Sequence, residues 1–349
     1  MVSRDHTISR RRALAGAAVL AAASGVAAAQ APAAPAASGA PPAREKGPRV
    51  WLDLDQKELD DAYDQAVYAP NISVILKRCA RNSELVRERL GPPKRFAYGP
   101  TPIEGLDVFT AKAANGEPGA GPRPTTNAPV NVFVHGGAWR AGFAKNYHYP
   151  AETFVNAGAH LVVLDFINVV EAGGDLMPMV DQVRRAVAWV YRNAPSFGGD
   201  PERLYVSGHS SGAHLTGVLL TTDWQKEFGL PATIIKGGVT GSGMYDLAPV
   251  RLSKRSGYVR FTDEVEDALS AQRHLDRLKA PVSLVYGTEE TPEFQRQSRD
   301  FAAAVKAAGK PVTLTVAEGY NHFEVMESLA SPYSAFGRAA LTQMRLAPA

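Results

Sequence analysis

The chain has 349 residues, 45% of them hydrophobic and 21% charged, which is ordinary for a soluble protein with a sizeable core. The formal net charge is +3, and the four arginines and one aspartate of residues 1–29 account for all of it. The rest of the chain has 34 basic and 34 acidic side chains, so its charge gives no indication of a nucleic-acid partner or of an anionic membrane surface.

Residues 1–29 predict an export signal. A basic stretch at residues 10–12 precedes an apolar run rich in Ala and Gly, which closes with three alanines at residues 27–29. Small residues at this point fit signal peptidase, and paired arginines resemble a twin-arginine (Tat) signal, which exports an already folded protein, here to the periplasm. The run is short and poor in Leu and Ile, so we expect no membrane span in the mature form.

Residues 30–48 are rich in Pro and Ala and lack apolar periodicity, so we expect a disordered linker before one domain that spans residues 49–349. Helical patterns follow near residues 56–67 and 71–90. The second helix contains Cys79, the only cysteine, so no intramolecular disulfide can form, and we expect Cys79 to be structural.

Residues 106–110 alternate like a half-exposed strand, and six later apolar runs are typical of strands that are buried on both faces. The six runs are residues 130–134, 161–166, 204–207, 234–239, 282–286 and 312–316, and helical segments at 176–194, 211–222 and 293–309 separate several of them. This alternation predicts an α/β fold with one mostly parallel central sheet, helices on both faces and at most a small cap.

The sequence HGGAW at residues 135–139 directly follows a predicted strand. A glycine-rich loop in this position leaves backbone N–H groups free to face a ligand, so we expect it to form an oxyanion hole with the residue that follows the nucleophile. The expected donors are the backbone N–H groups of Gly136, Gly137, Ala138 and Ser211. The alternative is a plain turn between a strand and a helix.

The pentapeptide GHSSG at residues 208–212 lies between the predicted strand 204–207 and a predicted helix. This is the context of a nucleophile elbow, in which two glycines permit a tight turn that lifts the serine above the sheet. We therefore predict that Ser210 is the nucleophile. The alternative is an ordinary turn rich in Gly and Ser.

A nucleophilic serine needs a base, and the base needs an orienting carboxylate. His322 lies just past the last predicted strand and is the expected base, whereas Glu290, just past the strand before it, is the expected acid. Glu289 competes with Glu290 for this role, and Asp246 is a more distant candidate. The order Ser210, Glu290, His322 is the chain order of α/β hydrolases.

Aromatic side chains near these motifs are candidates for an aromatic substrate pocket. They are Trp139, Phe143, Tyr147 and Tyr245, and core or surface packing is an equally good interpretation of each. Two nearby cations, Arg140 and Lys145, could meet a substrate carboxylate, but solvated surface positions are favoured. A further basic group, formed by Arg251, Lys254, Arg255 and Arg260, is expected to be a solvated face.

Five segments together resemble the kynurenine formamidase (arylformamidase) branch of the carboxylesterase-like α/β hydrolases. They are HGGAWR, residues 197–215, residues 242–250, GTEETPEFQRQS at residues 287–298 and GYNHFEV at residues 319–325. The resemblance implies an α/β-hydrolase fold, hydrolysis of N-formyl aryl amides or aryl esters by Ser210, Glu290 and His322, and neither a metal nor an organic cofactor. This chain departs from the family in having Glu290 where Asp is more frequent, and in its export signal.

The resulting functional prediction is a serine hydrolase that cleaves carboxylic esters or aryl (form)amides through a Ser-His-Glu triad and an acyl-enzyme. Its expected partner is a small-molecule ester or amide, with an aromatic substrate as one candidate, and the oligomeric state is open. One alternative is a true arylformamidase that acts on substrates like N-formyl-kynurenine. A different class, a non-catalytic binding protein on a hydrolase fold, is less favoured because all the catalytic residue types are present.

Overall fold

The computed structural model describes residues 45–111 and 125–346. The predicted signal segment, residues 1–29, and nearly all of the predicted linker lie outside the described residues, so both remain predictions. Among the residues that the structure describes, no helix is long and apolar enough to cross a bilayer.

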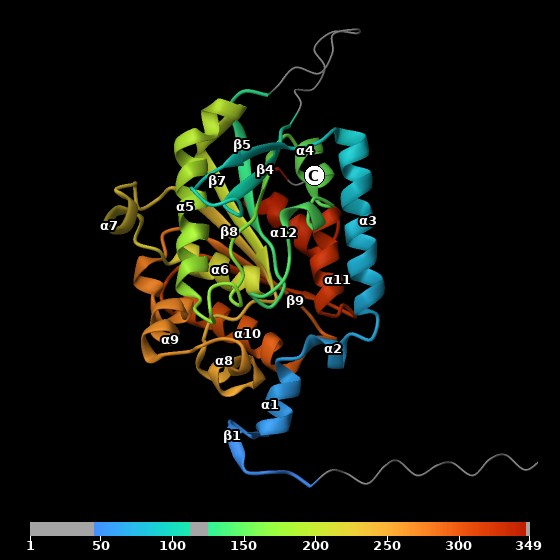
Figure 1. Cartoon of the computed structure of the whole chain (residues 1–349), viewed down its shortest axis with the longest axis vertical. Coiled ribbons are helices and arrows are strands. Elements are labelled where there is room, and N and C mark those ends of the chain that lie inside the picture. The colour runs from blue at the N-terminus through green and yellow to red at the C-terminus, as the bar shows by residue number, and fades with distance from the viewer. Residues whose placement is uncertain (1–44, 112–124, 347–349) are drawn as a thin grey trace, which may run out of the picture. The chain divides into compact units, whose positions relative to one another are not determined.

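An eight-stranded sheet forms the centre of the domain (Figure 1). In spatial order its strands are β10 (Val312–Ala317), β9 (Val282–Gly287), β8 (Ile235–Gly241), β7 (Gly199–His209), β5 (Ala128–Val134), β6 (His160–Leu164), β4 (Gly105–Phe109) and β3 (Lys94–Ala97). The strands from β10 to β6 are parallel, and β4 and β3 are added antiparallel at one edge. The predicted mostly parallel sheet is confirmed, and its parallel strands bring their carboxyl ends to one edge.

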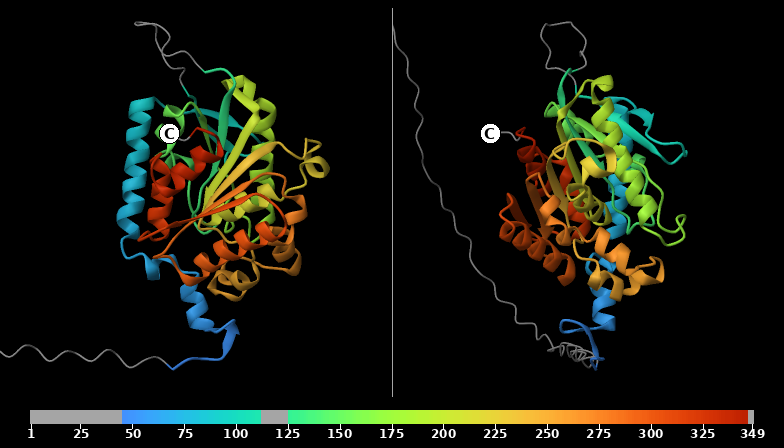
Figure 2. Two further views of the ribbon diagram at one scale, coloured as in Figure 1. Left: turned by 180° about the vertical axis from the view of Figure 1, so that it is seen from behind. Right: turned by 90° about the vertical axis from the view of Figure 1, so that its left-hand side faces the viewer.

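Both faces of the sheet are covered because the strand side chains alternate between two apolar cores. Val132 of β5 belongs to one core and its neighbour Phe133 to the other. The first core includes side chains of α5 (Met177–Asn193), α6 (Ser211–Leu220) and α10 (Pro292–Ala307). The second includes side chains of α3 (Ile72–Leu90), α4 (Ala151–Asn156), α11 (His322–Glu327) and α12 (Ala335–Gln343), and Figure 2 shows the helices on either side of the sheet.

The first predicted helix, residues 56–67, is divided in two. Helix α1 (Gln56–Ala62) ends before Asp64, whose carboxylate accepts a hydrogen bond from the backbone N–H of Ala66 and so caps α2 (Gln65–Tyr68). Asp at a helix N-cap satisfies a backbone donor that would otherwise have no partner. Asp64 was therefore the sequence signal that one helix ends and another begins within residues 56–67.

Helices α1 and α2 lie at the carboxyl end of the sheet, whereas α3 runs along one of its faces, and polar contacts hold this segment in place (Figure 1). The Tyr63 hydroxyl donates to Glu293 on α10 at 2.9 Å, and the Asn71 amide donates to Glu324 on α11 at 3.0 Å. Farther along α3, Arg78 forms an ion pair with Glu327. This N-terminal segment is thus attached to the same two helices, α10 and α11, that follow β9 and β10.

The connection from β8 to β9 is mostly helical and forms only a small cap. It contains α8 (Ala248–Leu252), the 3₁₀ turn η3 (Lys254–Gly257) and α9 (Asp263–Leu269). The remaining strands and α-helix are the hairpin strands β1 (Arg49–Trp51) and β2 (Leu54–Asp55) and helix α7 (Trp224–Phe228).

Strand β4 differs from its prediction because all its residues are buried. Its polar face carries Asp107, which accepts a hydrogen bond from Arg95 of β3 at 2.9 Å and contacts His148 Nε2 at 3.0 Å. Buried polar side chains of this kind require such partners. The alternating pattern that suggested exposure to solvent instead reflects a buried polar network.

Candidate active site

Ser210 occupies the sharp turn between β7 and α6, as expected of a nucleophile elbow. Its φ of 58° and ψ of −124° are unfavourable for a residue with a side chain, and strain of this kind is concentrated at functional sites. The turn is held by the Ser210 backbone N–H, which donates to the Gly241 carbonyl at 2.9 Å. A Cβ on Gly208 would lie 2.3 Å from the Gly212 carbonyl oxygen, so only glycine fits there.

His322 and Glu290 are joined by a buried hydrogen bond. The Nδ1 atom of His322, the first residue of α11, lies 2.7 Å from Glu290 Oε2, and the two residues are each 2% exposed. The other carboxylate oxygen of Glu290 accepts from the Ser242 hydroxyl at 2.6 Å and from the Gly287 backbone N–H at 2.7 Å. Two donors thus fix one oxygen of the Glu290 carboxylate, and the second oxygen orients the His322 imidazole.

The competing acids lie elsewhere. Glu289 is exposed, and its backbone N–H donates to the Tyr320 carbonyl. Asp246 is partly buried and accepts from the backbone N–H of Ala248 at 3.2 Å, as a residue at the start of α8. The structure therefore brings Glu290, rather than Glu289 or Asp246, to the imidazole of His322.

Burial controls the charges of this pair. Loss of solvation raises the pKa of Glu290 to about 7, although the donors Ser242 and Gly287 oppose the shift. Burial, followed by the positive charge of Arg255, holds the pKa of His322 well below its usual range. An imidazole that is uncharged at neutral pH is able to accept a proton from a neighbouring hydroxyl.

His209, which precedes Ser210, has a role that the sequence did not indicate. Its Nε2 lies 2.9 Å from the backbone carbonyl oxygen of His322, and because a carbonyl only accepts, Nε2 carries the proton. The ring centroids of the two histidines are 4.4 Å apart. This hydrogen bond joins the residue beside Ser210 directly to the backbone of His322, at the start of α11.

The glycine-rich loop after β5 packs against the Ser210 turn. A Cβ on Gly136 would lie 2.9 Å from the His209 carbonyl oxygen and 3.2 Å from Ser210 Cβ. Gly137 has φ of 124°, and a Cβ there would lie 1.9 Å from the Ala141 carbonyl oxygen. Within the described part of the chain, no hydrogen bond uses the backbone N–H groups predicted as oxyanion donors, those of Gly136, Gly137, Ala138 and Ser211. Unpaired N–H groups next to a serine hydroxyl can stabilise an anionic oxygen.

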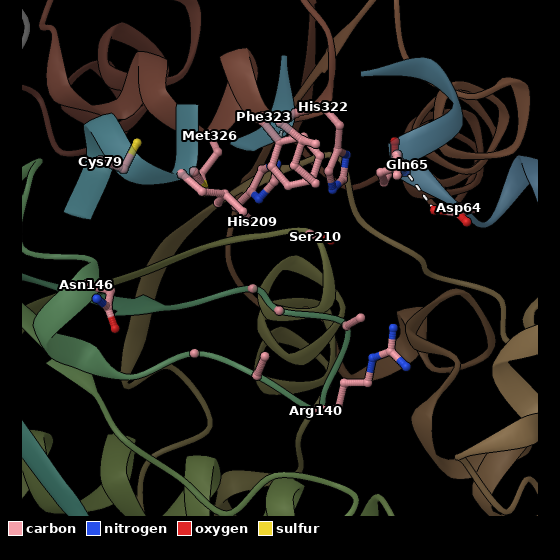
Figure 3. A pocket seen from close by; sticks show the side chains of 18 of the residues that line it. Asp64, Gln65, Cys79, Arg140, Asn146, His209, Ser210, His322, Phe323 and Met326 are labelled. Atoms are coloured by element: carbon pink, nitrogen blue, oxygen red, sulfur yellow. Dashed lines mark hydrogen bonds between the residues drawn. The ribbon is translucent and has the colours of Figure 1, made fainter. Parts of the chain in front are cut away.

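Ser210 and His322 open into one cavity of about 640 Å³. The residues that line this cavity fall into two groups that differ in polarity. One group of lining side chains is mainly apolar, namely Ile72, Leu76, Cys79, Ala80, Phe323 and Met326, and the other is polar or charged, namely Tyr63, Asp64, Gln65, Arg140, Lys254, Arg255 and Tyr258. Figure 3 shows Cys79 and Met326 on one side of Ser210, and Gln65, Asp64 and the guanidinium of Arg140 on the other.

Of the four predicted pocket aromatics, only Tyr147 lines this cavity. Trp139 is buried and its indole N–H donates to His214 Nδ1 at 3.1 Å, because its backbone follows the strained glycine loop and turns the ring toward α6. Tyr245 is buried and stacks on Phe301, with ring centroids 4.2 Å apart. Phe143 is 51% exposed.

Three basic residues that were expected to be solvated line the cavity, namely Arg140, Lys254 and Arg255. Arg140 and Lys254 are exposed as expected, and Arg140 lies over the ring of Tyr258, at 4.6 Å from its centroid. Arg255 differs from the expectation because it is only 5% exposed. The basic run in the sequence suggested a solvated face because nothing in it revealed that η3 folds against α1 and the glycine loop. Gln65 and Tyr63 were missed for a similar reason, since they belong to helical segments far in sequence from every motif.

No cluster of three or more His, Cys, Asp or Glu side chains within residues 45–111 and 125–346 is arranged to hold a metal ion. Cys79 lies in the cavity wall, and burial raises the pKa of its thiol to about 12. A thiol with so high a pKa is a poor nucleophile at neutral pH.

Comparison with known proteins gives consistent results. A model of the BD-FAE family matches residues 121–237, and a model of the prolyl oligopeptidase family matches residues 180–335. A kynurenine formamidase from Danio rerio is 28% identical over 293 residues, which are 80% of this chain and 93% of the relative. The esterase LipQ from Mycobacterium tuberculosis is 28% identical over 284 residues, or 73% of this chain and 62% of the relative.

Solved structures share the fold at lower identity. The crystal structure of a putative thioesterase from a Silicibacter species superimposes with a TM-score of 0.68 at 24% identity, covering 81% of this chain and 98% of that protein. Together these findings identify the chain as a hydrolase of the α/β-hydrolase fold that resembles kynurenine formamidases and esterases.

Proposed function

We propose that the protein is a serine hydrolase that cleaves carboxylic esters or aryl (form)amides with Ser210, His322 and Glu290. The observation that carries this proposal is the buried hydrogen bond of 2.7 Å between His322 and Glu290, at a cavity that His322 shares with the strained Ser210. A base oriented by a carboxylate and placed beside a raised serine is the arrangement of nucleophilic acyl transfer.

In the proposed reaction, His322 accepts the proton of the Ser210 hydroxyl while the serine oxygen attacks the substrate carbonyl. The negative charge on the carbonyl oxygen is stabilised by the backbone N–H groups of the glycine loop and of Ser211. The bond to the leaving alcohol or amine then breaks, and His322 returns the proton to it. Water, deprotonated by His322, attacks the acyl-enzyme and releases the acid.

The substrate is a small ester or amide with an aromatic or otherwise apolar group. The apolar half of the cavity, with Phe323, Met326 and Leu76, is suited to such a group. A true arylformamidase activity on substrates like N-formyl-kynurenine is the second candidate, and the similarity to the Danio rerio kynurenine formamidase over most of both chains favours it.

The test is a comparison of kcat/KM for N-formyl-kynurenine with that for a panel of 4-nitrophenyl esters, using the wild type and Ser210→Ala. A value near 10⁴ M⁻¹s⁻¹ or more for the formamide, above the esters, assigns the formamidase activity. Fast ester cleavage without formamide cleavage assigns a carboxylesterase. Labelling with a fluorophosphonate, located by mass spectrometry, should modify Ser210 and fail in Ser210→Ala. A Ser210→Ala variant with full activity refutes the mechanism.

We further propose that residues 1–29 direct export through the twin-arginine route and are removed, so that the hydrolase works in the periplasm. The paired arginines and the small residues at 27–29 support this. Replacing Arg10, Arg11 and Arg12 by lysine keeps the charge but removes the arginine pair. Cell fractionation should then find activity in the periplasm for the wild type and in the cytoplasm for the variant. Equal periplasmic activity of both proteins contradicts the proposed route.

A further inference from the structure

The charged half of the cavity contains a guanidinium without an acidic partner. Arg255 is 5% exposed, and its two terminal nitrogens donate to the Tyr258 hydroxyl at 3.0 Å and to the Tyr63 carbonyl at 3.1 Å. Both acceptors are uncharged, as is the Trp139 ring that the guanidinium carbon faces at 5.4 Å from the ring centroid, and its Nε makes no hydrogen bond within the described residues. A buried cation with unused N–H groups is unfavourable unless an anion approaches it.

Among the described residues, no acidic side chain forms an ion pair with Arg255. Asp64, the acid that lines the cavity on this side, forms its ion pair with Lys254 and interacts with Arg255 only at longer range. Arg140 adds a second guanidinium that stacks on Tyr258 and forms no ion pair within residues 45–111 and 125–346. The two histidines in the wall, His209 and His322, have pKa values held far below their usual range by burial, so they add no positive charge at neutral pH. The lining therefore has an excess of positive charge on one side of Ser210.

Gln65 is a second unpartnered polar group in the same part of the wall. It is 7% exposed, and neither its amide nitrogen nor its amide oxygen makes a hydrogen bond among the described residues. In Figure 3, Gln65 and Arg140 both lie to the right of Ser210, Gln65 above it and Arg140 below it, whereas Cys79 and Met326 lie to the left. The unused atoms of Gln65 and Arg255 are buried in this part of the wall, and a ligand that accepts hydrogen bonds would satisfy the Arg255 guanidinium and the Gln65 amide nitrogen.

We infer that Arg255, assisted by Arg140 and Gln65, forms a subsite for a carboxylate of the substrate, so that the enzyme selects esters or amides that carry a negative charge beside an apolar group. The inference rests on the proposed hydrolase function and specifies its substrate class. A carboxylate suits the site because its two oxygens match the planar guanidinium fork. One deeply buried guanidinium also balances one negative charge. The apolar half of the cavity takes the uncharged end of the same molecule.

Matched substrates that differ only in charge test the subsite. One pair places the charge on the acyl side, with mono(4-nitrophenyl) adipate against 4-nitrophenyl 5-carbamoylpentanoate. The other places it on the leaving group, with 3-carboxyphenyl acetate against 3-carbamoylphenyl acetate. In at least one pair, the wild type should show a kcat/KM about 10 to 100 times higher for the charged member, as expected for a hydrogen-bonded ion pair. A ratio of one or less in both pairs overturns the inference.

Variants of two arginines on the same connection locate the effect. Arg255→Met should lower the charged-to-neutral preference at least tenfold. Arg251→Met removes the same charge nearby, but Arg251 pairs with Asp263 and Glu266 and does not line the cavity, so it should leave the preference unchanged. An equal fall in both variants would indicate a general electrostatic effect and refute a subsite at Arg255.

A further measurement applies if Arg255→Met does not fold. In the wild type, benzoate should inhibit hydrolysis of 4-nitrophenyl acetate with a Ki at least ten times lower than that of benzamide, and Gln65→Leu should reduce this difference at least threefold. Equal Ki values refute the subsite while leaving the hydrolase function standing. If the wild type cleaves no ester or formamide, the proposed function fails, and calorimetric binding of benzoate against benzamide then decides on the subsite alone.

Discussion

Replacing Glu290 by glutamine tests the proposed triad with the smallest change of shape. In the wild type, Glu290 Oε1 accepts hydrogen bonds from the Ser242 hydroxyl and the Gly287 N–H, whereas Oε2 faces His322 Nδ1. The glutamine oxygen will take the Oε1 position, because an NH₂ group there would face the Gly287 N–H donor. The NH₂ group must then face His322 Nδ1, which can only accept from it.

This orientation forces the wrong tautomer on the imidazole. With Nδ1 acting as acceptor, the proton moves to Nε2, and the ring can no longer accept the proton of Ser210. Glu290→Gln should therefore reduce kcat by about 10⁴, as the equivalent Asp-to-Asn change does in serine proteases. That factor corresponds to about 5.5 kcal/mol of activation free energy. Burial raises the pKa of Glu290 to about 7, which means that the charged form is unfavourable in this site. Replacing it by a neutral glutamine should therefore leave the fold intact.

The assay is steady-state hydrolysis of 4-nitrophenyl acetate at pH 8, with kcat and KM determined separately and folding checked by urea unfolding. Glu289→Gln is the matched control, because Glu289 is adjacent and exposed, and its kcat should stay within about twofold of wild type. A Glu290→Gln variant that retains more than a tenth of the activity, or a Glu289→Gln variant that loses most of it, would show that Glu290 does not orient His322.

Three other predictions follow from the backbone and from buried histidine. Ser210→Gly removes the proposed nucleophile, so it should abolish turnover. It also removes a side chain from a residue with φ of 58°, so it should raise the free energy of unfolding in urea by about 1 kcal/mol. No gain in the free energy of unfolding would mean that the turn is unstrained. Gly137→Ala should lower kcat about 10²- to 10³-fold, because its Cβ would meet the Ala141 carbonyl oxygen at 1.9 Å and displace the glycine loop. The control Gly158→Ala, also at positive φ but in open space, should leave kcat unchanged. Equal effects of the two substitutions on kcat would exclude an oxyanion role for the loop. Burial lowers the pKa of His214 to about 4, so the protein loses stability as pH falls below the unfolded value of about 6.5. Between pH 7 and pH 5, His214→Gln should therefore lose about 2 kcal/mol less than the wild type in urea unfolding, and identical slopes would contradict the buried, neutral state.

Much of the sheet was predictable because its strands are buried on both faces. Continuous apolar runs such as residues 130–134 and 282–286 have no other ready explanation. Strand β3 gave no such signal, since Lys94–Ala97 lies at the edge of the sheet, pairs only with β4, and packs only Phe96 against the core. Strand β7 begins at Gly199, five residues before the apolar run that predicted it, and its polar first part gave no signal of a strand.

In the candidate site, the proposed catalytic residues were predictable from the sequence, whereas most of the cavity wall was not. Ser210, Glu290 and His322 were recognisable because each follows a strand at a fixed short distance, which local sequence records. The burial of Arg255 and Gln65 depends on how η3 and α2 pack against distant elements, and short segments of sequence do not encode that packing. The aromatic candidates failed for the opposite reason: Trp139 and Tyr245 lie close to motifs in sequence, but strand-end geometry directs their rings into the core.

The N-terminal helices have a consequence for how such an enzyme changes over evolution. The proposed reacting groups stand on the ends of β7, β9 and β10, whereas much of the binding wall comes from α1 to α3, a separate stretch attached by bonds such as Tyr63 to Glu293. Mutations in this stretch can reshape the wall without moving the catalytic residues. Substrate preference can therefore drift from one chemical class to another while the reaction stays the same. The strand ends would thus preserve the reaction, while α1 to α3 would determine which substrates are bound.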